Sequence, residues 1–255
     1  MPFANNAGYE LYYEDNAAGT RPLVFVPGFG GVGSFWRCQQ QYFAPRHRVI
    51  TVDHRGTGSS SKEKSEYSIG QMAEDVLAVL DRAKIDKATI VGHSTGGAIA
   101  QTLAALWPDR VENLVLSSTW CRPGNYFRRV FEFRRSLIER GDTDAYHVAG
   151  LLLRYQPSHL EVNEGVWTPP PFIDSDITIR RINAVIDSDM LERTRNLPHR
   201  SLIIATKDDL LVPKFLSDEL AATIPNSVYV VLEDGGHFHP ETKSEDFNTA
   251  LSGFL

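Results

Sequence analysis

Short runs of β-branched and other apolar residues alternate along the chain with longer stretches in which apolar residues recur every three or four positions. The short runs are typical of strands and the three-to-four-residue period of amphipathic helices. They predict strands at residues 9–14, 23–26, 49–53, 88–92, 111–117, 201–205 and 228–232, and helices at 34–44, 69–80, 97–106, 213–222 and 243–254. This alternation indicates a mostly parallel sheet with helices on both faces.

Two local signals refine this pattern. The first two strands are separated only by the turn Asn16-Ala17-Ala18-Gly19, so we expect them to be antiparallel neighbours at a sheet edge. Ser68 with Gln71 three residues later is a capping-box signal and predicts that a helix begins at Ile69.

The pattern changes between Trp120 and Asn196, where no strand-like run occurs and the apolar positions become helical and aromatic. Helices are expected around residues 127–137, 149–153 and 177–186, with a stiff linker at residues 167–172 that contains three consecutive prolines. We therefore expect a core of residues 1–119 and 197–255 and an inserted helical lid of residues 120–196. The arginines of these helices are interpreted as solvated helix faces in preference to an anion site: Arg128, Arg129, Arg134, Arg135, Arg180 and Arg181.

Composition excludes several classes of protein. The 255 residues are 42% hydrophobic and 23% charged, as in an ordinary globular protein. A net charge of −6 argues against general nucleic-acid binding, because a basic excess is needed to neutralise phosphates. Cys38 and Cys121 form neither a disulfide framework nor a metal-ligand cluster. Without a signal-peptide pattern or an apolar stretch of about 18 residues, we expect a cytoplasmic protein that binds no membrane and no metal.

The motif Gly92-x-Ser94-x-Gly96 joins a predicted strand to a predicted helix. This nucleophile-elbow pattern holds the serine in a strained turn with its hydroxyl above the sheet. The glycines allow the strand and helix backbones to approach closely. The N–H of Thr95, at the start of the helix, is then placed to bind the oxygen of an acyl group.

A glycine-rich turn near the N-terminus has two interpretations. Gly28-x-Gly30-x-x-Gly33, with Asp53 at the end of the next strand, fits a dinucleotide-binding fingerprint. Pro27 stands where the strand should enter the turn, and a turn-rich loop follows Asp53, so we favour the other interpretation. In it, the backbone N–H of Phe29 stabilises an oxyanion together with that of Thr95.

Two further loops at predicted strand ends carry polar side chains. One contains Asp208 and Asp209 and the other contains His237 and His239. Ligands bind beyond the carboxyl ends of parallel strands, so these loops are expected to meet Ser94 there.

The motifs together resemble the α/β-hydrolase superfamily over nearly the whole chain. They are Pro27-Gly28-Phe29-Gly30, Asp53-x-Arg55-Gly56-x-Gly58-x-Ser60, the elbow, Asp209-x-x-x-Pro213 and Gly235-Gly236-His237. The segments 55–58, 67–73 and 208–213 are similar to aminoacrylate (carbamate) hydrolases of uracil breakdown, and the N-terminal half is also similar to 3-oxoadipate enol-lactonases. The motif spacing selects Asp209 over Asp208 and His237 over His239.

The resemblance implies a serine hydrolase of the Ser-Asp-His order. Ser94 would attack a carbonyl, His237 would carry the proton and Asp209 would orient the imidazole. The expected substrate is a small ester, lactone or carbamoyl compound, and no cofactor is expected. The alternatives are a receptor-like hydrolase fold with little turnover and, third, a dinucleotide-binding protein; a homodimer is left open.

The lid and the loops supply candidates for the substrate pocket. His93 is interpreted either as part of the pocket wall or as a hydrogen-bonded structural histidine. The remaining candidates are aromatic and are equally consistent with a packed lid core: Trp120, Tyr155, Trp167, Phe172 and Phe238.

Overall fold

One eight-stranded sheet organises the computed structural model, which describes residues 3–63, 66–169 and 174–255. The strand order is β1-β2-β4-β3-β5-β6-β7-β8, with β1 and β2 antiparallel to their neighbours and the other strands parallel. The strands are β1 (Phe3–Asn6), β2 (Tyr9–Asp15), β3 (Pro22–Val26), β4 (Arg48–Val52), β5 (Ala88–His93), β6 (Val111–Ser117), β7 (Ser201–Thr206) and β8 (Ser227–Leu232).

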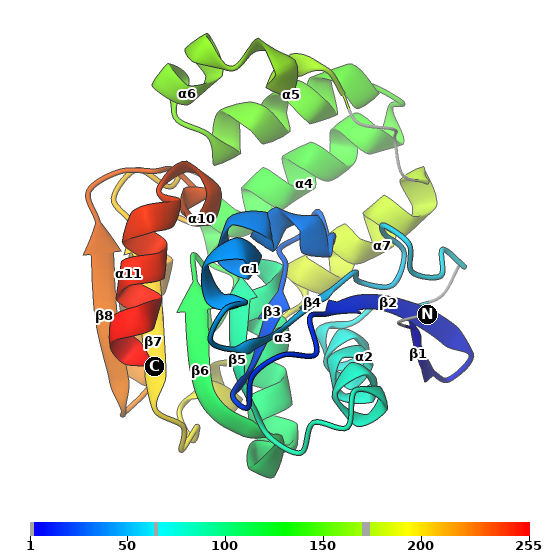
Figure 1. Ribbon diagram of the computed structural model, residues 1–255. Coiled ribbons are helices and arrows are strands. Elements are labelled where there is room, and N and C mark those ends of the chain that lie inside the picture. The colour runs from blue at the N-terminus through cyan, green and yellow to red at the C-terminus, as the bar shows by residue number, and fades with distance from the viewer. Residues whose placement is uncertain (1–2, 64–65, 170–173) are drawn as a thin grey trace.

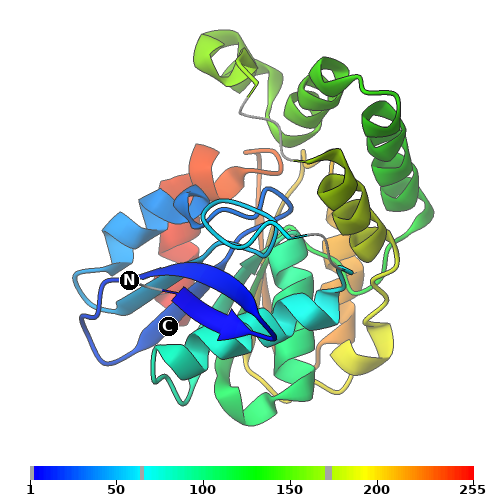
Figure 2. The same ribbon diagram turned by 90° about the vertical axis from the view of Figure 1, so that its right-hand side faces the viewer.

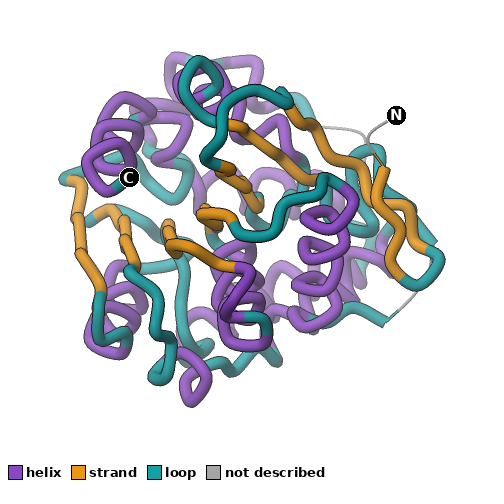
Figure 3. Tube along the Cα trace, turned by 60° about the horizontal axis from the view of Figure 1, so that its bottom comes forward, coloured by secondary structure: helices purple, strands orange, loops and turns teal. Residues whose placement is uncertain are grey.

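Helices cover both faces of this sheet (Figure 3). One face packs on η1 (Gly33–Trp36), α1 (Arg37–Phe43) and α11 (Ser244–Phe254). The other face packs on α2 (Ile69–Arg82), α3 (Thr95–Leu106), α8 (Leu191–Thr194) and α9 (Lys214–Thr223). The short helices η2 (Pro108–Arg110) and α10 (His239–Thr242) lie in connecting loops. Successive side chains of β3 point to opposite faces of the sheet: Val24 and Val26 face one core, and Leu23 and Phe25 face the other.

The predicted pairing of residues 9–14 with 23–26 is wrong. Strand β2 pairs with β1 and β4, and β4 lies between β2 and β3. The turn after β2 does not form a hairpin, because the Asn16 side chain binds the chain around β4 instead. Its amide donates to the carbonyl of His47 at 3.1 Å, and its oxygen accepts from the N–H of Val49 at 2.9 Å.

Most of the other predicted elements are confirmed to within a few residues. Helix α2 begins after Ser68, whose hydroxyl accepts from the N–H of Gln71 at 3.1 Å, as the capping signal predicted. Strand β1 was missed because its four residues contain no hydrophobic run. Its pairing with β2 and a 2.8 Å hydrogen bond from Asn6 to Asp75 of α2 hold it in place.

Between β6 and β7 the chain forms a separate group of helices at one end of the sheet (Figures 1 and 2). They are α4 (Asn125–Glu139), α5 (Thr143–Arg154), α6 (Pro157–Val162), η3 (Glu164–Trp167) and α7 (Ser175–Ile186). The arrowheads of β6 and β8 point toward this group, so it lies at the carboxyl ends of the parallel strands. Residues 170–172 of the predicted proline linker lie outside the described residues. The description of residues 120–196 as a lid stays a prediction.

The backbones at the junction of β5 and α3 approach one another closely. Ser94 has φ 53° and ψ −119°, which is unusual for a residue other than glycine. A Cβ on Gly92 would overlap the carbonyl oxygen of Gly96, and a Cβ on Gly96 would overlap that of Val26 in β3. A Cβ on Gly97 would lie 2.6 Å from Cβ of Thr119. Only glycine therefore allows α3 to start against the neighbouring strand.

The Gly96→Ala substitution should lower the free energy of unfolding by about 3 kcal/mol or more, because the added methyl group meets rigid backbone. Gly253→Ala is the matched control, since a Cβ at this position would have no atom within 4 Å and alanine favours the helix α11. Urea unfolding of the two variants measures the difference. Equal stabilities would contradict the close approach described for the elbow.

Candidate active site

Ser94 lies at the carboxyl end of β5 with its backbone held on both sides. Its N–H donates to the carbonyl of Ser117 at 2.8 Å, and its carbonyl accepts from the Thr119 hydroxyl at 2.8 Å. Its side chain is buried, yet its Oγ has no hydrogen-bond partner among the described residues. A buried hydroxyl without a partner is costly in a structural role and is available to a substrate.

His237 and Asp209 form a buried pair. Nδ1 of His237 lies 2.8 Å from Oδ2 of Asp209, and both side chains are almost fully buried. The other oxygen of Asp209 accepts from the N–H groups of Leu211 at 2.9 Å and Val212 at 2.8 Å. These bonds fix the carboxylate, which in turn fixes the orientation of the imidazole.

Asp208 has a different role in the same loop. Its carboxylate accepts from the N–H groups of Gly235 at 3.3 Å and Gly236 at 2.9 Å, and from the Gln156 amide at 2.6 Å. Asp208 therefore holds the glycine turn that carries His237 and does not contact the imidazole itself. The geometry agrees with the choice of Asp209 that the motif spacing favoured.

The turns that carry Ser94 and His237 meet at His93. The rings of His93 and His237 are 4.7 Å apart, and His93 immediately precedes Ser94. On the other side, a Cβ on Gly28 would lie 3.2 Å from Cβ of Ser94, which places the glycine-rich turn against the serine. A hydrogen bond from the serine to His237 is not formed here, and such bonds commonly tighten only when substrate binds.

The two N–H groups expected to form an oxyanion hole are available in the described structure. Neither the N–H of Phe29 nor that of Thr95 has a hydrogen-bond acceptor among the described residues. Thr95 is the first residue of α3, where an N–H has no partner within the helix. Their role in stabilising an oxyanion stays a prediction.

A second serine, Ser117, also contacts histidines. Its Oγ lies 3.0 Å from Nδ1 of His93 and 3.1 Å from Nε2 of His239. Burial lowers the pKa of His93 well below its ordinary value and that of His239 to about 3. Histidines that hold protons so weakly are poor general bases near neutral pH, and no described carboxylate hydrogen-bonds to either ring. This network was not predicted from the sequence, although His93 was interpreted as a hydrogen-bonded histidine.

The aromatic pocket candidates fall into different environments. Trp120 is buried in the core, where its Nε1 donates to the Ser188 hydroxyl at 3.1 Å. Trp167 is 41% exposed and donates to the carbonyl of Leu160 at 3.3 Å within the helical segment. The ring centre of Phe238 lies 5.7 Å from that of His237 and 5.2 Å from that of Tyr155. Phe172 lies outside the described residues.

Asp53, the acidic residue of the dinucleotide-binding fingerprint, binds backbone N–H groups of its own chain. Asp53 accepts from the N–H of Gly33 at 2.7 Å with one oxygen and from the N–H of Ser59 at 2.9 Å with the other. Both oxygens that would bind a ribose are thus engaged, one with the glycine-rich turn and the other with the loop that follows β4. This arrangement favours the oxyanion interpretation of that turn.

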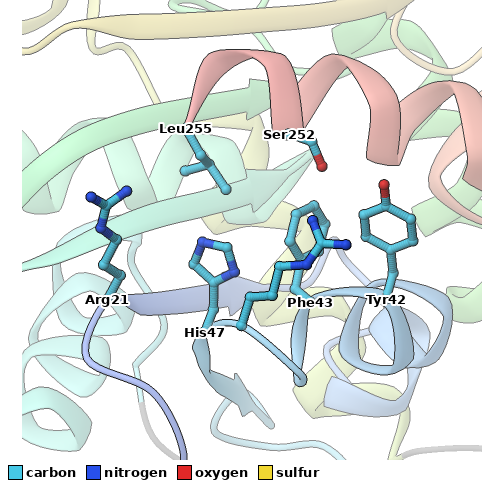
Figure 4. A pocket seen from close by; sticks show the side chains of 7 residues that line it. Arg21, Tyr42, Phe43, His47, Ser252 and Leu255 are labelled. Atoms are coloured by element: carbon cyan, nitrogen blue, oxygen red, sulfur yellow. The ribbon is translucent and has the colours of Figure 1, made fainter.

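The described parts of the chain also contain a surface hollow that neither Ser94 nor His237 lines. A hollow of about 200 Å³ opens between α11 and the chain after α1 (Figure 4). Its lining residues are Arg21, Tyr42, Phe43, Arg46, His47, Ser252 and Leu255. Within the described ranges, no three or more potential ligands are grouped to hold a metal ion, and no helix could span a membrane.

Comparison with known proteins identifies the family to which this fold belongs. The family profile described as "alpha/beta hydrolase fold" matches residues 21–141. RutD of Azorhizobium caulinodans, named as a carbamate hydrolase, is 35% identical over 100% of this chain and 98% of its own length. RutD of Caulobacter vibrioides is 36% identical over 96% and 95%. The enol-lactonase of Burkholderia xenovorans superposes with a TM-score of 0.92 at 26% identity, covering 100% of this chain and 99% of that one.

Acid should destabilise the protein through its buried neutral histidines. The pKa of His239 is about 3 in the folded protein and about 6.5 when unfolded. The unfolded chain therefore binds the proton first as the pH falls below 6.5, and the folded state loses stability until about pH 3. Between pH 7 and 5 this one group should cost about 2 kcal/mol.

Urea unfolding of the protein and of His239→Gln at pH 7 and pH 5 measures this contribution. The variant should lose about 2 kcal/mol less than the original chain over this interval. The same pH-dependent loss in both proteins would show that His239 is not held neutral by burial.

Proposed function

This chain belongs to the α/β-hydrolase fold family and is a hydrolase, and from that premise we propose that it cleaves a small acyl or carbamoyl compound by serine catalysis. The observation that carries the proposal is the 2.8 Å hydrogen bond between Asp209 and His237 beside the strained, unpartnered Ser94. A nucleophile, an imidazole base and an orienting carboxylate are the three groups that this chemistry requires.

In the proposed first half-reaction, Oγ of Ser94 attacks the carbonyl carbon as Nε2 of His237 takes the hydroxyl proton. Asp209 keeps Nδ1 protonated through its hydrogen bond and stabilises the imidazolium that forms. The N–H groups of Phe29 and Thr95 bind the oxyanion, and each such donor contributes about 3 kcal/mol to transition-state stabilisation. Collapse of the intermediate returns the proton to the leaving group and leaves an acyl-enzyme.

In the second half-reaction, His237 takes a proton from water, which attacks the acyl-enzyme at the same carbon. The resulting acid or carbamate leaves, and Ser94 recovers its proton. No cofactor enters either step. The low accessibility of Ser94 and His237 keeps bulk water from the reacting atoms, which strengthens the electrostatic interactions on which both steps depend.

The substrate class is inferred from the relatives and from the site together. Two similar proteins are named for carbamate hydrolysis, and a similar structure is an enol-lactonase. A carbamate ester, a lactone and a simple ester each present an acyl carbonyl carbon to Ser94, so the same three groups can act on each. Aminoacrylate is a separate candidate, because its only carbonyl is a carboxylate and its hydrolysis would release ammonia from the carbon that bears the amine. We propose these classes as candidates, with the carbamoyl compound first because the proteins named for carbamate hydrolysis have the higher sequence identity.

Replacing Ser94 by alanine should lower kcat by at least about 10⁴-fold on whichever candidate is turned over, while leaving the fold intact. The panel consists of 4-nitrophenyl esters of increasing acyl length, an enol-lactone, a simple amide and aminoacrylate. Unchanged activity in Ser94→Ala would contradict the nucleophile assignment. Binding of panel members without turnover by the original chain would instead favour a receptor-like protein.

The two neighbouring aspartates should respond differently to the same change. Asp209→Asn should lower kcat on the order of 10⁴-fold, because the amide cannot hold the required imidazole tautomer. Asp208→Asn is the matched control and should retain most of the activity while lowering the melting temperature, since Asp208 holds the glycine turn. Initial rates at saturating substrate separate the two variants. A greater loss of kcat in Asp208→Asn would contradict the proposed roles.

A further inference from the structure

Three arginines near the site have no carboxylate partner. Arg134 of α4, Arg154 of α5 and Arg181 of α7 form no ion pair with any described residue. Arg134 and Arg181 are each only 3% exposed, so for these two of the six arginines the expectation of a solvated helix face is wrong. Buried charges are usually paired, so an unpaired group of like charge requires an explanation.

The side chains of these arginines pack against the two turns that carry Phe29 and His237. The guanidinium carbons of Arg134 and Arg181 lie 5.5 and 5.3 Å from the ring centre of Phe29, in the glycine-rich turn. The guanidinium carbon of Arg154 lies 5.1 Å from the ring centre of Phe238, which follows His237. The backbone of Arg154 also joins this turn, because its carbonyl accepts from the N–H of His237 at 2.9 Å.

Protein groups satisfy these guanidinium groups only in part. Arg181 donates to the carbonyls of Phe29 at 2.7 Å and Arg55 at 3.4 Å, and Arg134 donates to the Tyr146 hydroxyl at 3.0 Å. The Nε atoms of Arg134 and Arg154 are buried and have no hydrogen-bond partner among the described residues. Two N–H donors thus remain on different helices beside the proposed active site.

Burial and the proximity of like charges make the cationic forms of these arginines less favourable than they are in water. Burial and the charge of Arg134 lower the pKa of Arg154 to about 10, and burial lowers that of Arg181 to about 10. Both remain cationic at neutral pH, so the aromatic faces only partly offset their desolvation. Glu241 is near enough to affect Arg154 but forms no ion pair with it, and instead accepts from Tyr155 at 3.3 Å.

We propose that Arg134 and Arg154, supported by the adjacent charge of Arg181, bind a carboxylate carried by the substrate. Guanidinium groups match carboxylates in shape and form charge-assisted hydrogen bonds with them. The subsite would hold a small anionic acyl compound with its carbonyl at Ser94. This inference deepens the proposed function and rests on it for the identity of the ligand as a substrate.

The subsite also accounts for how a protein with a net charge of −6 attracts an anion. A local cluster of three cations in a low-dielectric surround creates a positive field that the distant surface carboxylates do not cancel. Arg181 has an additional positioning role, because its bond to the Phe29 carbonyl holds the turn whose N–H faces the oxyanion.

A pair of esters of equal length tests the subsite. Mono-4-nitrophenyl succinate carries a terminal carboxylate, whereas 4-nitrophenyl butyrate ends in a methyl group. The original chain should show a kcat/KM at least about tenfold higher for the succinate ester. Arg134→Gln and Arg154→Gln should each lower that value on the order of 30-fold, the effect of losing one charged hydrogen bond, and lower the butyrate value much less, so that the preference for the succinate ester is lost. Arg134→Lys should retain part of the preference.

Arg129→Gln is the matched control, because Arg129 is on α4 like Arg134 but its side chain is 85% exposed. It should behave as the original chain with both esters. Absence of a preference for the succinate ester, or a parallel loss with both esters in Arg134→Gln and Arg154→Gln, would overturn the subsite while leaving the hydrolase proposal standing.

Direct binding separates the subsite from the hydrolase proposal. Succinate itself, titrated calorimetrically, should bind the original chain and bind Arg134→Gln and Arg154→Gln at least about tenfold more weakly. If succinate binds in this way but neither ester is cleaved, the anion subsite stands and the hydrolase proposal fails for these esters. If succinate does not bind, the subsite is overturned whatever the rates show.

Discussion

The close contact of backbones at the β5–α3 junction is the constraint on which the rest of the site depends. Three glycines remove every Cβ that would separate α3 from β3 and from Thr119, and the helix therefore starts directly above the central strands. The consequence is the left-handed conformation of Ser94, whose N–H donates to Ser117 at the end of β6 and whose carbonyl accepts from Thr119 just beyond it. Backbone strain of this kind persists only where surrounding structure enforces it.

Burial then determines what each polar group near this junction can do. The buried carboxylate of Asp209 accepts from two N–H groups and pairs with His237, whereas burial lowers the pKa of His93 and His239 and so disfavours their protonated forms. The arginines around Phe29 are the opposite case, since their charge is buried without a protein anion to match it. The site therefore contains a hydrogen-bonded carboxylate, weakly basic imidazoles and a group of guanidinium groups that have no described carboxylate partner. A bound anion would stabilise this last group most.

Local sequence patterns predicted much of this arrangement. The elbow, the loops at strand ends and the choice of Asp209 followed from short-range spacing, because turns and caps depend on a few adjacent residues. The order of β2, β4 and β3 did not, because it depends on contacts such as Asn16 with the loop before β4. The buried arginines were misjudged although a signal existed: Arg134 falls on the apolar stripe of Phe127, Phe131 and Ile138, and only tertiary packing shows that this stripe is covered.

Covalent labelling with a fluorophosphonate, followed by peptide mass spectrometry, tests most directly that Ser94 is the activated nucleophile. The structure offers a rival, because Ser117 also lies within hydrogen-bond distance of two histidines. We expect one adduct per chain, located on Ser94, and none in Ser94→Ala. An adduct on Ser117, or equal labelling of Ser94→Ala, would contradict the account of the site given by its geometry.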